Sequence, residues 1–197
     1  MKRADPVKPD DQPAAAAKKT ASHKSGRTVN DSVRPLCAKI IDKDEFFMRQ
    51  ALKQAQKAAE KDEVPVGALI VKNGTIIARG YNTREKTHDP SGHAEINALR
   101  RAAKKLSGWN LHGCELYVTL EPCPMCAGAI INARVARVFY GARDSAFGAC
   151  GGVTNLFMEQ FPHRPALVGG ILAEDCQAVL AEFFEKLRQG KPSTQSF

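Results

Sequence analysis

Three side chains that commonly bind zinc occur in two short stretches of the sequence. His93 opens the segment 93–95 (HAE), and Cys123 and Cys126 lie in the segment 122–126 (PCPMC). One imidazole and two thiolates leave the fourth position of a tetrahedral ion open to water, which is typical of catalytic rather than structural zinc. Bound zinc lowers the pKa of that water to about 7. The two stretches therefore predict one hydrolytic zinc centre per chain.

Glu95 is the candidate for moving protons beside this ion. It lies two residues after His93, and on a regular helix those side chains point about 200° apart. They converge only if the site lies in front of the helix start. Pro124 is tolerated in a first helical turn, which places Cys123 at the start of another helix. Two helix N-termini would then face one ion, and a carboxylate that does not bind the ion can shuttle protons.

The same cysteines and histidine are also compatible with a redox pair or with a structural metal site. A Cys-x-x-Cys pair can be redox-active, as in thioredoxin-like proteins, but it then follows the first strand of the fold. Here it follows the third predicted strand. A structural zinc site would need a fourth ligand, for which His88, Cys114 and Cys150 are candidates.

The surrounding pattern predicts the elements that position these residues. Helices are predicted over 44–61, 93–105, 124–132 and 173–188, and strands over 66–71, 75–81, 115–120, 135–140 and 166–168. Asn73-Gly74 predicts a hairpin between the first two strands. Asp44 and Ser91 are candidate N-caps of the first two helices. Residues 83–90 are expected to form a loop and residues 142–165 a long connection. The order predicts an α/β protein whose mixed sheet carries helices on its faces.

The front of the chain differs in composition from the remainder. Of 197 residues with a net charge of +8, residues 1–40 hold nine basic and four acidic side chains and few large apolar ones. Such a segment buries too little surface to fold alone, so we expect residues 1–40 to be a disordered basic extension and residues 41–197 to be one zinc-dependent domain. The extension is either a solubilising tail or an arm that binds nucleic acid.

The sequence also indicates a cellular setting. It contains no run of about 18 apolar residues and no short apolar segment after its basic start, so neither a membrane span nor a secretory signal is expected. With no export signal, its six cysteines are expected to be reduced thiols in a cytoplasmic protein.

At the residues that carry this chemistry, the sequence resembles the bacterial tRNA-specific adenosine deaminases of the zinc-dependent cytidine/deoxycytidylate deaminase superfamily. A His-x-Glu at one helix start and a Pro-Cys-x-x-Cys at the next is a known signature of zinc nucleobase deaminases. The flanking segments favour the tRNA enzymes, and they are 64–68, 80–82, 88–96, 116–123, 141–144 and 170–173. The resemblance implies a cytidine-deaminase-like, three-layer α/β/α fold with a mixed five-stranded sheet.

The resemblance also implies an activity. It is hydrolytic deamination of adenosine to inosine at wobble position 34 of tRNA, by zinc-activated water with Glu95 as proton shuttle. His93, Cys123 and Cys126 would bind one Zn²⁺ per subunit. The family works as a homodimer that binds the tRNA anticodon loop across its subunits.

Five further residues are candidates for substrate binding. By resemblance, Asn82 contacts the target nucleoside, the backbone at Ala94 holds the base edge, and Asp144 touches RNA beside the flipped base. Arg143, a basic residue near the motif, is a candidate phosphate contact. His88 either lines the mouth of the pocket or packs within its loop.

The resemblance has two departures and leaves two alternative functions open. Gly92 stands where the family often has alanine, and the run 150–152 also differs, so the resemblance assigns no RNA contacts to the 145–165 loop. The first alternative is a free-base or nucleoside deaminase, such as a guanine deaminase. The second is a non-catalytic, zinc-stabilised subunit that binds tRNA, against which the presence of Glu95 argues.

Overall fold

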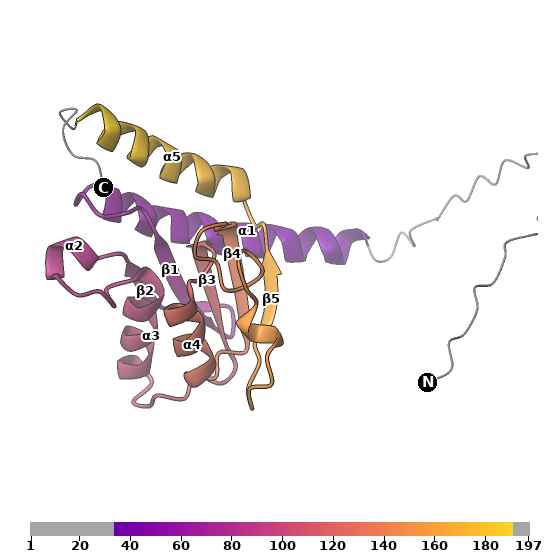
Figure 1. The fold of residues 1–197 in the computed structure, drawn as a ribbon. Coiled ribbons are helices and arrows are strands. Elements are labelled where there is room, and N and C mark those ends of the chain that lie inside the picture. The colour runs from indigo at the N-terminus through magenta and orange to yellow at the C-terminus, as the bar shows by residue number, and fades with distance from the viewer. Residues whose placement is uncertain (1–33, 191–197) are drawn as a thin grey trace, which may run out of the picture.

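A computed structural model describes residues 34–190 of the chain, and the side chains of residues 43–190. The helices are α1 (Arg34–Ala59), α2 (Arg84–Thr87), α3 (Ala94–Lys105), α4 (Pro124–Asn132), the 3₁₀ turn η1 (Leu156–Met158) and α5 (Ala173–Gln189) (Figure 1). The strands are β1 (Gly67–Lys72), β2 (Thr75–Tyr81), β3 (Cys114–Leu120), β4 (Arg137–Ala142) and β5 (Ala166–Gly169).

The strands form one sheet in the order β2-β1-β3-β4-β5. β1 is antiparallel to both β2 and β3, whereas β3–β4 and β4–β5 are parallel pairs. The predicted mixed five-stranded sheet is confirmed. It follows that β2, β3 and β4 run in one direction and end at the same edge of the sheet. In sheets of this kind, ligands commonly bind outside the carboxyl ends of the strands.

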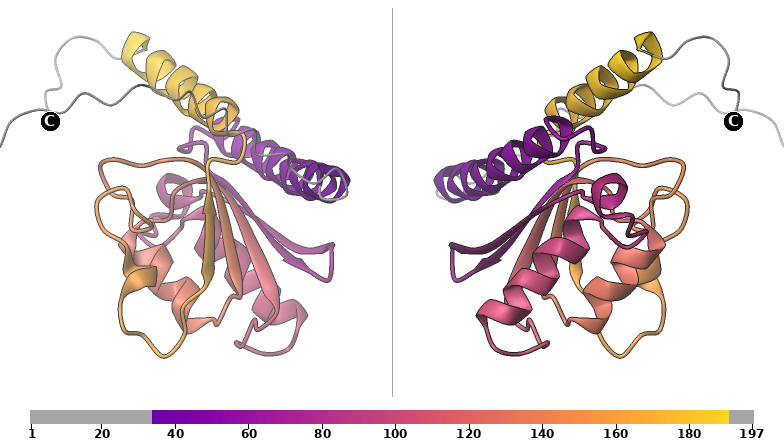
Figure 2. Two further views of the ribbon diagram at one scale, coloured as in Figure 1. Left: turned by 90° about the vertical axis from the view of Figure 1, so that its right-hand side faces the viewer. Right: turned by 90° about the vertical axis from the view of Figure 1, so that its left-hand side faces the viewer.

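Helices cover both faces of the sheet, as Figure 2 shows. Leu69 and Tyr117 point to the face covered by α1 and α5, and their neighbours Ile70 and Leu116 point to the face covered by α3 and α4. Successive side chains of a strand point to opposite faces, so both sets are buried in separate cores. The predicted three-layer α/β/α arrangement is confirmed.

The first helix begins earlier than the sequence pattern predicts. It starts at Arg34, so residues 34–40 of the predicted extension are helical, and Asp44 lies inside the helix instead of capping it. The Asp44 carboxylate accepts a hydrogen bond of 2.7 Å from the Tyr117 hydroxyl. The prediction of Asp44 as N-cap was wrong because a distant strand uses its side chain. The prediction for residues 1–33 lies outside the described residues.

Two local predictions near the second long helix were also wrong. The segment 83–90 contains the short helix α2 as well as loop. The N-cap of α3 is His93, not Ser91. Ser91 is held in a local turn, since its backbone N–H and hydroxyl both donate to Oδ1 of Asp89, at 2.8 and 2.7 Å. Other element ends differ from the prediction by one or two residues, with β4 shifted to Arg137–Ala142.

Two further features bear on the predicted setting. The cysteines whose side chains are described (Cys114, Cys123, Cys126, Cys150 and Cys176) are all free. Among the helices of residues 34–190, none has the length and apolar composition needed to cross a membrane.

Candidate active site

The start of α3 is fixed by its close packing on β2. A Cβ atom on Gly80 would lie 2.1 Å from the carbonyl oxygen of Ala94 and 2.6 Å from the backbone nitrogen of Ala98. Only glycine at this position allows the first turn of α3 to lie so close to the strand. This packing places His93, the N-cap of α3, at the sheet edge where β2 ends.

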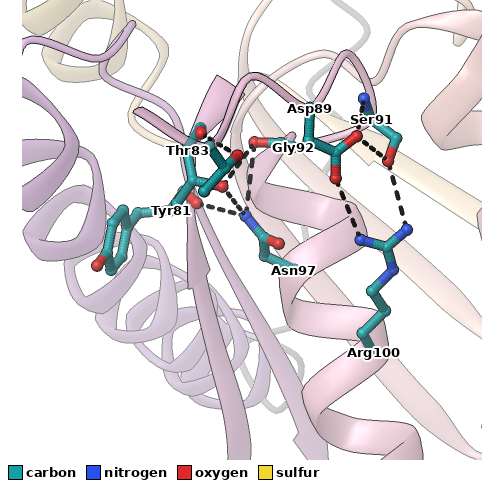
Figure 3. Close-up of polar contacts among 8 residues, drawn as sticks. Tyr81, Thr83, Asp89, Ser91, Gly92, Asn97 and Arg100 are labelled. Atoms are coloured by element: carbon teal, nitrogen blue, oxygen red, sulfur yellow. Dashed lines mark hydrogen bonds and ion pairs between the residues drawn. The ribbon is translucent and has the colours of Figure 1, made fainter. Parts of the chain in front are cut away.

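The loop between β2 and α3 is tied to the helix by Asn97 (Figure 3). The Asn97 side-chain amide donates to the carbonyl oxygen of Tyr81 at 2.9 Å and to the hydroxyl of Thr83 at 3.0 Å. The backbone N–H of Thr83 donates to the carbonyl oxygen of Gly92 at 2.8 Å. The Asn97 amide also donates to the carbonyl oxygen of Gly92 at 3.5 Å, so it joins the residue that ends β2 to the residue before His93.

Arg100 holds the other part of the same loop (Figure 3). Its guanidinium lies 3.6 Å from the carboxylate of Asp89 and donates to the hydroxyl of Ser91 at 3.3 Å. The hydrogen bond from the Ser91 hydroxyl is the main reason why the pKa of Asp89 lies below its usual range. The chain that leads into His93 is thus held from two turns of α3.

His93, Cys123 and Cys126 form one group, called here the metal-ligand group, whose ligand atoms all lie within 4.8 Å of one another. Nδ1 of His93 lies 3.7 Å from Sγ of Cys123 and 3.5 Å from Sγ of Cys126. Zinc bonds of about 2.0 Å to nitrogen and about 2.3 Å to sulfur separate two tetrahedral ligand atoms by about 3.5 Å. The donor set and its spacing therefore fit one zinc ion.

The metal-ligand group faces two helix starts. His93 is the N-cap of α3, Cys123 is the N-cap of α4, and Pro124 takes the first helical position of α4. No fourth histidine, cysteine or carboxylate among residues 43–190 joins the group. Of the three candidates for a fourth ligand, His88 is exposed, Cys114 begins β3 at the opposite edge of the sheet, and Cys150 is buried outside the group. Three protein ligands are the number that a catalytic zinc site uses.

Hydrogen bonds within the metal-ligand group favour a thiolate. The thiol of Cys126 donates to Cys123, and with the help of His93 this lowers the pKa of Cys123 to about 4. The same hydrogen bond raises the pKa of Cys126. The hydrogen bond to Cys123 also raises the pKa of His93. A thiolate is the form of cysteine that binds metals.

Glu95 lies in the first turn of α3 and is only 4% exposed. Its burial raises the pKa of its carboxyl group to about 7. A group with such a pKa exists in both protonation states near neutral pH, which suits it to accept a proton and then donate it.

His93, Glu95 and Cys123 line one pocket of about 350 Å³ at the carboxyl edge of the sheet, whereas Cys126 is fully buried and does not line it. Asn82 and Asp144, which follow the ends of β2 and β4, line the same pocket. The pocket is large enough for a nucleobase and its ribose.

Comparison with known proteins decides the family. The family model for MafB19-like deaminases matches residues 41–188. The tRNA-specific adenosine deaminase of Bacillus subtilis (strain 168) is 47% identical over 156 residues, which cover 79% of this chain and 97% of the relative. The chain belongs to the family of tRNA-specific adenosine deaminases.

Solved structures resemble this deaminase as well. One comes from a study of A-to-I editing by tRNA:A34 deaminases at the wobble position of transfer RNA. It is 41% identical, with a TM-score of 0.67, and the match covers 68% of this chain and 99% of that one. A structure of guanine deaminase from Nitrosomonas europaea is 27% identical, with a TM-score of 0.64, and the match covers 71% of this chain and 83% of that one.

The predicted substrate-binding residues of the deaminase divide into two groups. Asn82 and Asp144 line the pocket. Ala94 is fully buried at the start of α3 and does not line the pocket. Arg143 is exposed and donates to the carbonyl oxygen of Gly151, and His88 is exposed at the C-terminal end of α2. Neither Arg143 nor His88 lines the pocket.

Glu121 is a residue of this site for which the sequence pattern predicted no role. It is 2% exposed and lines the pocket. Its carboxylate accepts hydrogen bonds from the backbone N–H groups of Asp144 (3.0 Å), Cys150 (2.8 Å) and Gly152 (2.7 Å). These bonds hold the first part of the connection after β4, including the segment 150–152 that departs from the family pattern. A carboxylate directly before Pro-Cys was the only sequence signal for this role.

Proposed function

We propose that this deaminase hydrolyses the 6-amino group of adenosine at wobble position 34 of tRNA, producing inosine and ammonia. The observation that carries the proposal is the position of Glu95, a buried carboxyl group that lines one pocket together with His93 and Cys123 of the metal-ligand group. Membership of the tRNA-specific adenosine deaminase family supports tRNA as the substrate.

We propose that the metal-ligand group binds one Zn²⁺ per chain through Nδ1 of His93 and the sulfur atoms of Cys123 and Cys126. The distances among these atoms support this assignment. When bound, zinc acts as a Lewis acid that makes a water molecule nucleophilic near neutral pH.

Glu95 moves the protons of the reaction in this proposal. Its carboxylate accepts a proton from the attacking water and delivers it to N1 of adenine. A second proton transfer, to the amino group, allows ammonia to leave. The pKa of about 7 that burial gives Glu95 supports this double role.

The remaining candidates bind the RNA. Asn82 contacts the target nucleoside inside the pocket, and Asp144, which also lines the pocket, contacts the RNA beside the flipped base. The backbone at Ala94 holds the base edge. Arg143 and His88 contact the anticodon loop outside the pocket. An anticodon loop exposes unpaired bases, so moving one into a pocket costs less free energy than extracting it from a duplex.

We also propose that the deaminase is a homodimer that acts on tRNA in the cytoplasm. An apolar groove between α3 and α4 supports a contact with a second copy, since Leu99, Leu111 and Trp109 line it and Trp109 is 64% exposed. Light scattering on the purified protein tests this state, and we expect Trp109→Ser to shift the mass toward that of one chain.

Sequencing tRNA after incubation with the pure protein tests the function, since inosine is read as guanosine at position 34. The likeness to a guanine deaminase structure supports a second candidate, deamination of a free purine. Release of ammonia from guanine but not from tRNA would favour that candidate. Binding of tRNA without any release of ammonia would favour a non-catalytic subunit.

A further inference from the structure

A buried carboxylate outside the pocket contacts two of the segments that line it. Glu63 lies between α1 and β1 and is 1% exposed. Its Oε2 accepts hydrogen bonds from the side-chain amide of Asn82 at 3.2 Å and from the backbone N–H of Glu85 at 3.1 Å. Its Oε1 accepts a hydrogen bond from the backbone N–H of Lys86 at 2.8 Å. Glu63 itself does not line the pocket.

The contact with Glu63 determines how the amide of Asn82 is oriented. A carboxylate can only accept hydrogen bonds, so the amide nitrogen of Asn82 must face Glu63 and its oxygen must face away. One N–H and the amide oxygen of Asn82 then remain for a ligand in the pocket. Without Glu63, the amide could rotate by half a turn and exchange its donor and acceptor.

The same carboxylate fixes α2 beside the pocket. The N–H groups of Glu85 and Lys86 belong to the first turn of α2, where the backbone has no partner within the helix. Two residues of α2, Arg84 and Glu85, line the pocket. One buried side chain therefore holds both the pocket amide and the segment next to it.

We propose that Glu63 is a positioning residue for deamination. It presents the amide of Asn82 to the substrate in one orientation and holds α2 against the pocket, without touching the substrate itself. The inference rests on the proposed function, in which Asn82 contacts the target nucleoside.

Kinetics of Glu63→Ala and Glu63→Gln, in the wild-type chain and in an Asn82→Ala background, test this role. With anticodon stem-loop RNA as substrate, we expect Glu63→Ala to lower kcat/KM by about 10- to 100-fold with unchanged zinc content. The glutamine of Glu63→Gln still offers one oxygen at the position of Oε2, which accepts two of the three bonds. The loss of log kcat/KM in this variant should therefore be at most half of the loss in Glu63→Ala.

The Asn82→Ala background separates positioning from a general structural effect. The fold-loss of kcat/KM caused by Glu63→Ala can be measured in both backgrounds. If Glu63 acts mainly through Asn82, this loss should be at least five times smaller in the Asn82→Ala background than in the wild-type chain. Equal losses in both backgrounds, or wild-type kcat/KM in Glu63→Ala, would overturn the proposal. If Glu63→Ala does not fold, the same comparison of backgrounds with Glu63→Gln decides the question.

Glu115→Gln is the matched control. Glu115 is a buried carboxylate that pairs with Arg137 at the opposite edge of the sheet. We expect its loss to lower the thermal midpoint but to leave kcat/KM within about twofold well below that midpoint. If the wild type deaminates guanine and not RNA, the proposed function is wrong, and the same ratios measured with guanine still decide the role of Glu63.

Discussion

Sγ of Cys126 lies 3.5 Å from Nδ1 of His93, although 33 residues separate them in the chain. The two residues come from different helices, and each helix starts at the edge where β2 and β3 end. The metal-ligand group therefore depends on the order of the strands, which brings the two helix starts together, as well as on the spacing of the ligands in the sequence.

Removal of one ligand should remove the metal. We expect the wild type to hold about one zinc ion per chain, and Cys126→Ala to hold less than about a tenth of that with no deamination. Elemental analysis of the purified proteins measures this. Cys114→Ala, which removes another buried cysteine far from the pocket, should keep its zinc. A zinc content in Cys126→Ala equal to that of the wild type would show that Cys126 is not a metal ligand.

Glu95→Gln should separate catalysis from metal binding. The amide keeps the size of the side chain but cannot carry protons, so kcat should fall by about 100- to 10,000-fold while the zinc content stays the same. Single-turnover assays with RNA measure the rate, and elemental analysis measures the metal. Zinc lost together with activity would mean that Glu95 is a ligand or a structural residue.

Glu121→Ala should loosen the loop after β4. Three backbone N–H groups lose their common acceptor, so the free energy of unfolding should fall by about 2–3 kcal/mol. Hydrogen exchange should become faster at Asp144, Cys150 and Gly152. Glu182→Ala removes an exposed carboxylate that pairs with Lys186, and it should leave the stability almost unchanged because solvent screens an exposed ion pair. Unchanged exchange at the three amides would contradict the role given to Glu121.

Phe147 should contribute to RNA binding at the rim of the pocket. Its side chain lines the pocket but is 71% exposed, and its backbone N–H donates to Asp144 at 3.1 Å. Stacking of an unpaired base on such a ring is worth about 1–3 kcal/mol, so Phe147→Ala should raise KM for RNA by about 5- to 150-fold. Val153→Ala alters an exposed side chain outside the pocket and should leave KM for RNA unchanged. Equal KM values for the two variants would exclude stacking on Phe147.

Most elements, and the residues that could carry the chemistry, were predictable from local patterns in the sequence. Apolar spacing predicted the long helices and the strands, since burial of one face is a local property of the pattern. His-x-Glu and Pro-Cys-x-x-Cys predicted their own positions at helix starts, because Pro124 is tolerated only in a first turn. Asp44 and Ser91 were misread as caps because short polar side chains can serve either a cap or a more distant partner.

Which residues meet in space depends on how the strands pair. The order β2-β1-β3-β4-β5 brings Asn82, Cys123 and Asp144 to one edge, and pairing between distant strands is not encoded in any local spacing. The roles of Glu63 and Glu121 arise in the same way. Each buried carboxylate accepts N–H groups 19 to 31 residues away in the chain. Burying a carboxylate without hydrogen-bond donors costs free energy, so each of these carboxylates needs such donors. Which N–H groups become the donors depends on the tertiary fold.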